Sequence, residues 1–483
     1  MNGANMRYPI FILLSSLLAT PLGLAIGENG NAQPGPKPAT RPNVIFIMAD
    51  DLGYGDLGSY GQTMISTPHI DRLAEEGIRF TDAYAQTVCA PARSSLMTGH
   101  HNGHGRLRDN IPHGIFLRPD DFTLAELMKQ AGYKTGGVGK WSLGNPGSWG
   151  VPNYQGFDYY YGHLNQDQAH FYYPDYLWEN DQVKLLHEVR KPGGMLGNRG
   201  HGREFYTQDL FTEKALGFIR QHHEDPFFLY LPYTIPHFSD YPTDSPEIFI
   251  VPSDAPYSDQ DWPQVSKNYA AMITRMDRDV GRIMLLLENL GIDSNTLVFF
   301  TSDNGPWGGS PIHSVEFFDS NGPLRGVKRD VYEGGIRVPL IARWPGRISP
   351  GQTSHQLIAL WDMMPTLAEL VGLPVPSGVD GISVLPTLLD GSLVERDYLY
   401  WDYGHVRQAF KQAVRWGKWK GVRLAVGAQL ELYDLENDIG EDRDIASNHP
   451  EIVHSIEAMM EAALELTPDY PIPGLNAPAP ESD

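Results

Sequence analysis

Short, nearly continuous apolar runs recur along the first three quarters of the chain. They lie at residues 43–48, 135–138, 227–231 and 297–300. Such runs are typical of strands buried on both faces, as in parallel sheets covered by helices. Three of the runs follow segments with helical periodicity, at residues 123–131, 207–222 and 269–290. The repeated order of helix and strand predicts an α/β fold with a large, doubly wound, mixed but mainly parallel sheet flanked by helices.

The pattern changes near residue 375. A helical segment at 361–371 is followed by a stretch rich in Pro and Gly, and short alternating runs come next. These runs lie at residues 398–403, 412–416, 419–424 and 430–433. An amphipathic helix is expected at 450–466. Short strands with one helix predict a smaller C-terminal α+β domain, an antiparallel sheet plus a helix.

The N-terminal segment has the order of a signal peptide. Arg7 precedes an apolar run at 8–26, and the small residues Ala25 and Gly27 stand before a polar stretch. The alternative is a single membrane anchor. However, polar residues interrupt the apolar run and small residues follow it, and both features favour cleavage. We therefore expect a signal peptide at 1–27, a linker at 28–41, a catalytic domain at 42–375 and the C-terminal domain at 376–483. The protein is then exported, periplasmic or secreted, with no stable membrane anchor.

Charge and cysteine content narrow the function. The net charge of −22 repels phosphate backbones, which argues against a nucleic-acid partner. The chain has one cysteine, Cys89, so no intrachain disulfide can form. Exported chains usually pair their cysteines, and a lone thiol therefore needs a chemical explanation.

Polar residues follow each of the four predicted core strands. They are Asp50 and Asp51, Lys140, His237, and Asp303 with Asn304. In open α/β sheets, ligands bind outside the carboxyl ends of the strands, so these side chains are expected to meet at one edge. Carboxylate and amide oxygens suit a hard divalent cation, Ca²⁺ or Mg²⁺, better than zinc. The pattern predicts one such ion.

Cys89 precedes a predicted short helix. Pro91 is suited to the first helical position and Gly99 to the stop, so Cys89 is expected just before a helix N-terminus. Arg93 adds a fixed positive charge in the first turn. This setting predicts a depressed thiol pKa and a reactive cysteine, whereas a free cysteine is otherwise usually buried and inert.

The run at 89–93 resembles the Cys-x-Pro-x-Arg signature of type I sulfatases, arylsulfatase-like members of the alkaline phosphatase superfamily. Four further segments look like family motifs: the two metal motifs and the two lysine motifs. They lie at residues 48–56, 301–305, 137–141 and 326–339. A segment at 432–438 is also similar, and together the motifs span about residues 42–450. Their order along the chain makes the resemblance specific.

The resemblance implies a sulfuric ester hydrolase that releases inorganic sulfate from aryl or carbohydrate sulfates. In the family the signature cysteine, here Cys89, is oxidised by a formylglycine-generating or sulfatase-maturing enzyme to formylglycine (3-oxoalanine). The hydrated aldehyde attacks sulfur beside the metal, and its second hydroxyl helps to expel sulfate. By position, the metal ligands are Asp50, Asp51, Cys89, Asp303 and Asn304. The remaining catalytic roles fall to Arg93, Lys140, Lys328 and, as proton donor to the leaving alcohol, His237.

One position departs from the family pattern. Many members carry a histidine two residues after the first lysine, where this chain has Ser142. Three histidines in loops near the motifs are candidate replacements: His104, His113 and His313. In addition, the stretch at 166–178 is dense in aromatic residues, which either form a stacking surface for the substrate or pack an insertion against the sheet.

Three other functions compete with sulfate hydrolysis. The chain could be a phosphate or phosphonate ester hydrolase of the same superfamily, or a non-catalytic binder of sulfated glycans. A cysteine protease or redox thiol is the third alternative, and it predicts activity that alkylation blocks and chelators do not affect. The substrate partner is expected to be a small-molecule or glycan sulfate ester.

Overall fold

The computed structural model describes residues 41–110, 114–186, 203–239, 243–407 and 409–478. The expected signal peptide at 1–27, and the expected linker except for Arg41, lie outside the described residues. None of the helices in the described ranges combines the length and the hydropathy that a bilayer span requires.

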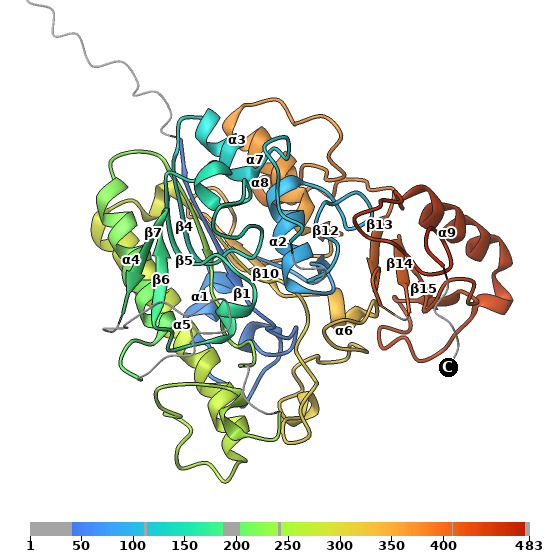
Figure 1. The fold of residues 1–483 in the computed structure, drawn as a ribbon, viewed down its shortest axis with the longest axis horizontal. Coiled ribbons are helices and arrows are strands. Elements are labelled where there is room, and N and C mark those ends of the chain that lie inside the picture. Colours follow the sequence, from blue (N-terminus) through green and yellow to red (C-terminus); the bar gives the residue numbers. More distant parts are fainter. Residues whose placement is uncertain (1–40, 111–113, 187–202, 240–242, 408, 479–483) are drawn as a thin grey trace, which may run out of the picture. The chain divides into compact units, whose positions relative to one another are not determined.

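A ten-stranded sheet forms the centre of the described chain (Figure 1). In spatial order its strands are β11 (Gln352–Ser354), β2 (Ile78–Phe80), β10 (Leu340–Arg343), β9 (Thr296–Ser302), β1 (Asn43–Ala49), β8 (Phe227–Pro232), β4 (Lys134–Lys140), β5 (Tyr159–His163), β6 (Tyr176–Glu179) and β7 (Gln182–Leu185). The five strands from β9 to β5 are mutually parallel. In contrast, β10 is antiparallel to both of its neighbours, and β6 and β7 extend the other edge as antiparallel strands. The expected mixed, mainly parallel sheet is confirmed.

Both faces of the sheet are covered because the central strands are apolar on both sides. In β1, Ile45 and Ile47 point into one core, whereas Phe46 and Met48 point into the other. The first core is closed by α1 (Pro68–Glu75), α4 (Thr207–His222) and α5 (Gln264–Leu290). The second is closed by α2 (Cys89–Thr98), α3 (Leu124–Gln130), α7 (Met363–Val371) and α8 (Leu385–Asp390). Each fully buried side chain of this kind stabilises the fold by about 1.5–3 kcal/mol, which fixes the strands that carry the site.

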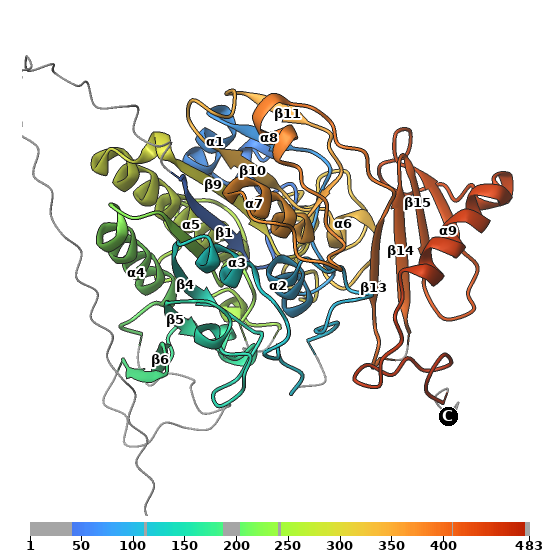
Figure 2. The ribbon, with the colours of Figure 1, turned by 90° about the horizontal axis from the view of Figure 1, so that it is seen from above.

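A four-stranded antiparallel sheet follows near the C-terminus. Its strands are β13 (Leu399–Tyr403), β14 (Lys411–Trp416), β15 (Trp419–Arg423) and β16 (Glu431–Asp434). On one face Trp401 packs against Tyr84 of the short strand β3 (Ala83–Tyr84), and its indole N–H donates to the Ala85 carbonyl at 2.8 Å. The other face, with Val414, packs on Ile456 of α9 (Pro450–Ala462) (Figure 2). The expected C-terminal antiparallel sheet and helix are therefore present.

Candidate active site

The carboxyl ends of the two central strands place four oxygen-bearing side chains side by side. Since Ala49 of β1 pairs in register with Ser302 of β9, the residues that follow each strand emerge together. The backbone N–H of Asp51 donates to Asp303 Oδ1 at 3.1 Å, and Asn304 Nδ2 donates to Asp51 Oδ1 at 2.8 Å. Asp51 has a φ of 65°, a left-handed conformation that is unusual for a residue other than glycine. Such strain is found where the surrounding structure holds a side chain in a required direction.

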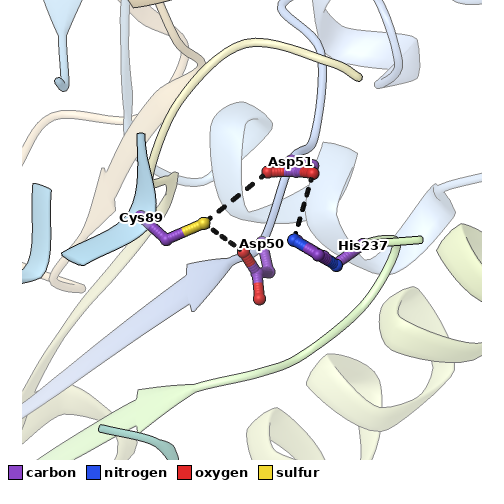
Figure 3. Close-up of side chains that lie close together, drawn as sticks. All are labelled: Asp50, Asp51, Cys89 and His237. Atoms are coloured by element: carbon purple, nitrogen blue, oxygen red, sulfur yellow. Dashed lines mark hydrogen bonds and ion pairs between the residues drawn. The ribbon is translucent and has the colours of Figure 1, made fainter. Parts of the chain in front are cut away.

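Cys89 is the first residue of α2 and points at the two aspartates that follow β1 (Figure 3). Its thiol donates to Asp50 Oδ1 at 3.4 Å and lies 4.0 Å from Asp51 Oδ1. The helix begins two residues earlier than the sequence predicted from Pro91, and it ends at Gly99 as expected, with a φ of 74°. The signature cysteine therefore lies within contact distance of the predicted metal-binding strand ends.

Three cations balance the carboxylates. Lys140 Nζ donates to Asp50 Oδ2 at 2.8 Å, and Lys328 Nζ donates to Asp51 Oδ1 at 2.6 Å. Lys328 also reaches Cys89 Sγ at 3.2 Å. Arg93 donates to the Lys140 carbonyl at 2.8 Å and to Asp303 Oδ2 at 2.9 Å. All three cations are buried, so water screens these attractions only weakly.

The expected depression of the Cys89 pKa is wrong. Burial raises the pKa of the Cys89 thiol to about 12, and the positive charges of Lys140 and Lys328 oppose this shift only in part. The helix start and Arg93 were the basis of the prediction, but complete burial disfavours the thiolate more strongly. The unmodified residue is therefore a neutral thiol and a poor nucleophile.

Two of the three carboxylates, Asp50 and Asp303, differ in their pKa values. Burial works against ionisation of Asp50, but the positive charges of Lys140 and Arg93 hold its pKa well below the usual range. Burial and the neighbouring negative charge of Asp50 together raise the pKa of Asp303 to about 7, although Arg93 opposes the shift. Crowded carboxylates of this kind are stabilised by a cation placed between them.

The donor set fits a divalent cation. Asp50, Asp51, Cys89 and His237 each offer a ligand atom, and these atoms all lie within 4.8 Å of one another. Two buried oxygens in the same place, Asp51 Oδ2 and Asn304 Oδ1, have no hydrogen-bond partner. Buried acceptors without a donor are costly, and a bound ion satisfies them. The predominance of oxygen favours Ca²⁺ or Mg²⁺.

His237 follows β8 and lies against the same carboxylates. Its Nδ1–H donates to the Phe238 carbonyl at 2.6 Å, which leaves Nε2 without a proton in the neutral ring, 3.6 Å from Asp51 Oδ2. Burial, together with the charge of Lys328, lowers the pKa of His237 well below its ordinary value. The resting imidazole is therefore neutral and directs a lone pair toward the site.

His170, not one of the three candidate histidines, stacks on His237. The rings of His170 and His237 lie 4.3 Å apart with an interplanar angle of 22°. His104 instead contacts Asp380, and His313 packs between the rings of Phe249 and Tyr269. His113 lies outside the described residues. His170 belongs to the aromatic stretch at 166–178, and the signal that could have revealed it is the strand β5, whose end leads into this loop.

The other aromatic residues of the stretch at 166–178 mainly pack this segment against the rest of the protein. Tyr172 and Tyr176 are buried, and the Tyr172 hydroxyl donates to the Thr234 carbonyl at 2.9 Å, below the loop that carries His237. Ser142, at the position where many family members have histidine, has a φ of 69° and a buried hydroxyl. Asn, Asp and His are enriched several-fold among the non-glycine residues in this left-handed conformation, so the backbone here would also suit a histidine.

Comparisons with known proteins agree with this geometry. The sequence model of the family described as Sulfatase matches residues 42–373, and that described as N-sulphoglucosamine sulphohydrolase, C-terminal, matches residues 326–467. N-acetylgalactosamine-6-sulfatase of Rattus norvegicus is 36% identical over 389 residues, covering 74% of this chain and 68% of that protein. N-acetylgalactosamine-6-O-sulfatase of Bacteroides thetaiotaomicron is 31% identical, covering 87% of this chain and 93% of that protein.

A solved structure extends the likeness to the fold of the whole described chain. The crystal structure of Ps i-CgsB in complex with k-i-k-neocarrahexaose superimposes with a TM-score of 0.74 at 28% identity, covering 90% of this chain and 94% of that chain. The C-terminal sheet is thus part of the shared architecture. On the family match, the relatives and the shared fold, the chain belongs to the sulfatase family of the alkaline phosphatase superfamily and is a sulfuric ester hydrolase.

Proposed function

We propose that this sulfatase hydrolyses a carbohydrate sulfate with a formylglycine made from Cys89 and one hard divalent cation, Ca²⁺ or Mg²⁺. The observation that carries the proposal is the position of the buried Cys89 Sγ, between Lys328 Nζ at 3.2 Å and Asp50 Oδ1 at 3.4 Å. As a neutral thiol in this position, Cys89 is a poor nucleophile and a soft ligand in a hard site. Oxidation to the aldehyde replaces sulfur by oxygen, which removes both mismatches.

Asp50, Asp51, Asp303 and Asn304 would hold the cation together with modified residue 89. When present, the cation supplies Lewis acidity and the hydrated aldehyde supplies the oxygen nucleophile. The protein's own contribution is electrostatic. We expect the sulfate oxygens to gain negative charge beside the buried positive charges of Lys140, Lys328 and Arg93. These charges are already in place, so solvent does not have to reorganise during the reaction.

His237 is proposed as the proton donor to the leaving alcohol. Its Nδ1–H is held by the Phe238 carbonyl, so only Nε2 can exchange a proton with the substrate. An arriving sulfate ester brings negative charge, which raises the pKa of a nearby imidazole and favours its protonated form. The same proton then lies where the alkoxide forms as the S–O bond breaks.

We further propose 6-sulfated N-acetylgalactosamine as the first substrate to test, because the two relatives named above are N-acetylgalactosamine-6-sulfatases. We also propose that residues 1–27 direct export of the protein. A formylglycine-generating or sulfatase-maturing enzyme would modify Cys89. The catalytic domain is proposed at 42–375 and the smaller domain at 376–483, a division that keeps β13 to β16 and α9 together.

The test compares mature protein with the Cys89→Ala variant on defined sulfated sugars, with an aryl sulfate and an aryl phosphate as references. We expect sulfate release from the sugars by the mature protein alone, loss of activity on chelation, and recovery with Ca²⁺ or Mg²⁺. Faster turnover of the phosphate ester, or full activity of Cys89→Ala, would contradict the proposal.

A further inference from the structure

A second cluster of metal-binding side chains lies at the opposite end of α2 from Cys89. Three histidines follow the helix stop at Gly99, and they surround the carboxylate of Asp380. The helix has 10 residues, so at about 1.5 Å per residue the cluster is about 15 Å from the active site. None of these residues takes part in the sulfatase chemistry described above.

The distances are those of a compact ligand set. His104 Nδ1 lies 2.8 Å from Asp380 Oδ1, and His101 Nε2 lies 3.7 Å from the same oxygen. One ligand atom from each of the three residues lies within 4.8 Å of the other two. His100 faces the other carboxylate oxygen, with Nδ1 at 3.4 Å from Oδ2, and we assign it no ligand role.

The cluster is held in place before any ion arrives. The backbone N–H of His101 donates to Asp380 Oδ2 at 3.0 Å, which fixes the carboxylate. The ring of His101 stacks on that of His104 and packs against Tyr400 at 5.3 Å and Trp361 at 6.1 Å. Rigid packing of this kind prepares ligands for binding, because little conformational entropy remains to be lost.

The partners of Asp380 are side chains that can also bind a metal ion. In the part of the chain that the structure describes, the ion-pair partners of Asp380 are imidazoles alone, with no lysine or arginine among them. His101 is only 6% exposed, and its Nδ1 is buried without a hydrogen-bond partner. A buried imidazole beside a carboxylate is a common ligand pair for zinc.

Solvent reaches the cluster through an adjoining cavity of about 320 Å³, lined by His100, His104 and Val379 among others. An ion and its water can enter there, and a water molecule can fill a fourth coordination position. Imidazole nitrogens select zinc and related transition metals, whereas the oxygen-rich active site selects hard ions. The two sites therefore differ in the metal that they prefer.

We propose that His101, His104 and Asp380 form a binding site for a divalent transition metal of the zinc class. The ion joins the loop after α2 to the segment around Asp380. It also stabilises the attachment of the C-terminal sheet, because Asn102, between the two histidines, donates through its side chain to Asp402 Oδ1 of β13 at 2.7 Å.

The test measures Zn²⁺ binding by calorimetry on metal-stripped full-length protein whose active site is first filled with excess Ca²⁺ or Mg²⁺. We expect one zinc-binding event per chain and a higher melting temperature with zinc. The His104→Ala variant should bind zinc about 100-fold more weakly, since it lacks a ligand, and should keep its kcat on an aryl sulfate. His454→Ala, which removes an exposed histidine of α9, is the matched control.

Copper EPR gives a readout that does not depend on stability. Cu²⁺ in the wild-type protein should show coupling to imidazole nitrogens, and this coupling should diminish in His104→Ala but not in His454→Ala. Because His104 is partly exposed, its variant is expected to fold, and Asp380→Asn provides a second ligand change. Equal zinc affinity in wild type and His104→Ala, or no binding beyond the Ca²⁺-filled site, would overturn the proposal.

Discussion

At the scale of single residues, the site depends on the balance between three buried carboxylates and three buried cations. Lys328 is central to it because its Nζ contacts both Asp51 and Cys89. Replacing this lysine removes a positive charge that water cannot replace, because the side chain is only 2% exposed.

Lys328→Met should therefore lower kcat on an aryl sulfate by about 10²–10³-fold, the cost of losing one preorganised electrostatic contact. Conversion of Cys89 is checked on the same sample by mass spectrometry, so that failed maturation is not mistaken for failed catalysis. Lys418→Met, a change at a partly exposed lysine in the turn between β14 and β15, is the control. A decrease in kcat of less than about threefold would show that Lys328 does not contribute to catalysis.

His170 is expected to position His237 and not to transfer a proton itself. The stacked rings restrain the His237 imidazole, and misplacement of a catalytic group is costly to the rate. We expect His170→Ala to lower kcat about 10-fold or more, and His170→Phe to restore most of the rate because it keeps an aromatic face. If phenylalanine fails as completely as alanine while His237 keeps its place in a crystal structure, a proton-transfer role is favoured instead.

At the scale of elements, buried capping groups link neighbouring helices. Asp277 of α5 accepts the backbone N–H groups of His69 and Ile70 at 2.9 and 2.8 Å, and so caps the start of α1. Both bonds go to one carboxylate oxygen. Burial raises the pKa of Asp277 to about 7, so the carboxyl group is mostly protonated in the folded protein below that pH.

The pH dependence follows from linkage. A carboxyl whose folded pKa is raised contributes stability that is complete below its unfolded pKa of about 3.9, and the contribution disappears as the pH rises through 7. Asp277→Asn keeps the accepting oxygen but cannot ionise. We expect the variant to gain stability over the wild type on the order of 1 kcal/mol at pH 8, and less at pH 5.

Urea unfolding of both proteins at the two pH values measures this difference. Asp259→Asn, which alters an exposed carboxylate, controls for the change in net charge. A stability difference between Asp277→Asn and wild type that is the same at both pH values would show that Asp277 is ionised in the folded protein.

The element pattern was predicted well where periodicity is strong. The runs at 43–48 and 227–231 became β1 and β8, and the helix expected at 207–222 has those bounds in the structure. Short strands with little apolar signal, such as β2 and β11, were missed because sheet pairing and not local propensity forms them. The antiparallel direction of β10 also depends on tertiary pairing, which no local pattern records.

The site was predicted less evenly than the fold. Residues that follow strong strands were foreseen as neighbours, since parallel strands end at one edge of the sheet. The Cys89 pKa was predicted in the wrong direction, because complete burial is a property of the packed fold and is not visible in the motif. His170 was missed as a site residue for a related reason: its loop reaches His237 only through folding.

At the scale of the whole molecule, a buried charge network joins the C-terminal sheet to the segment that carries Lys328. Lys420 of β15 donates to Glu333 Oε1 at 2.7 Å and lies 3.3 Å from Glu441 Oε1, and all three side chains are fully buried. Glu333 begins α6 (Glu333–Ile336), five residues after Lys328. The small sheet thus supports one wall of the active site.

Lys420→Met should destabilise the protein by about 3–5 kcal/mol, because buried Glu441 loses its cation and buried Glu333 keeps only Arg337. Burial already raises the pKa of Glu441 to about 7, so removing its charge should recover part of the loss. Urea unfolding is therefore compared for Lys420→Met and for the double variant with Glu441→Gln. If the double variant is no more stable than the single one, the charge network does not hold the two parts together.

Whether the enzyme acts through an aldehyde made from its only thiol can be read from the mass of the peptide at residues 80–93, which trypsin releases from active protein. We expect a peptide about 18 Da lighter than the encoded cysteine form, the difference between thiol and aldehyde, in a fraction that rises in proportion to specific activity. A fully active preparation in which this peptide has the mass of the unmodified thiol would rule out the aldehyde mechanism.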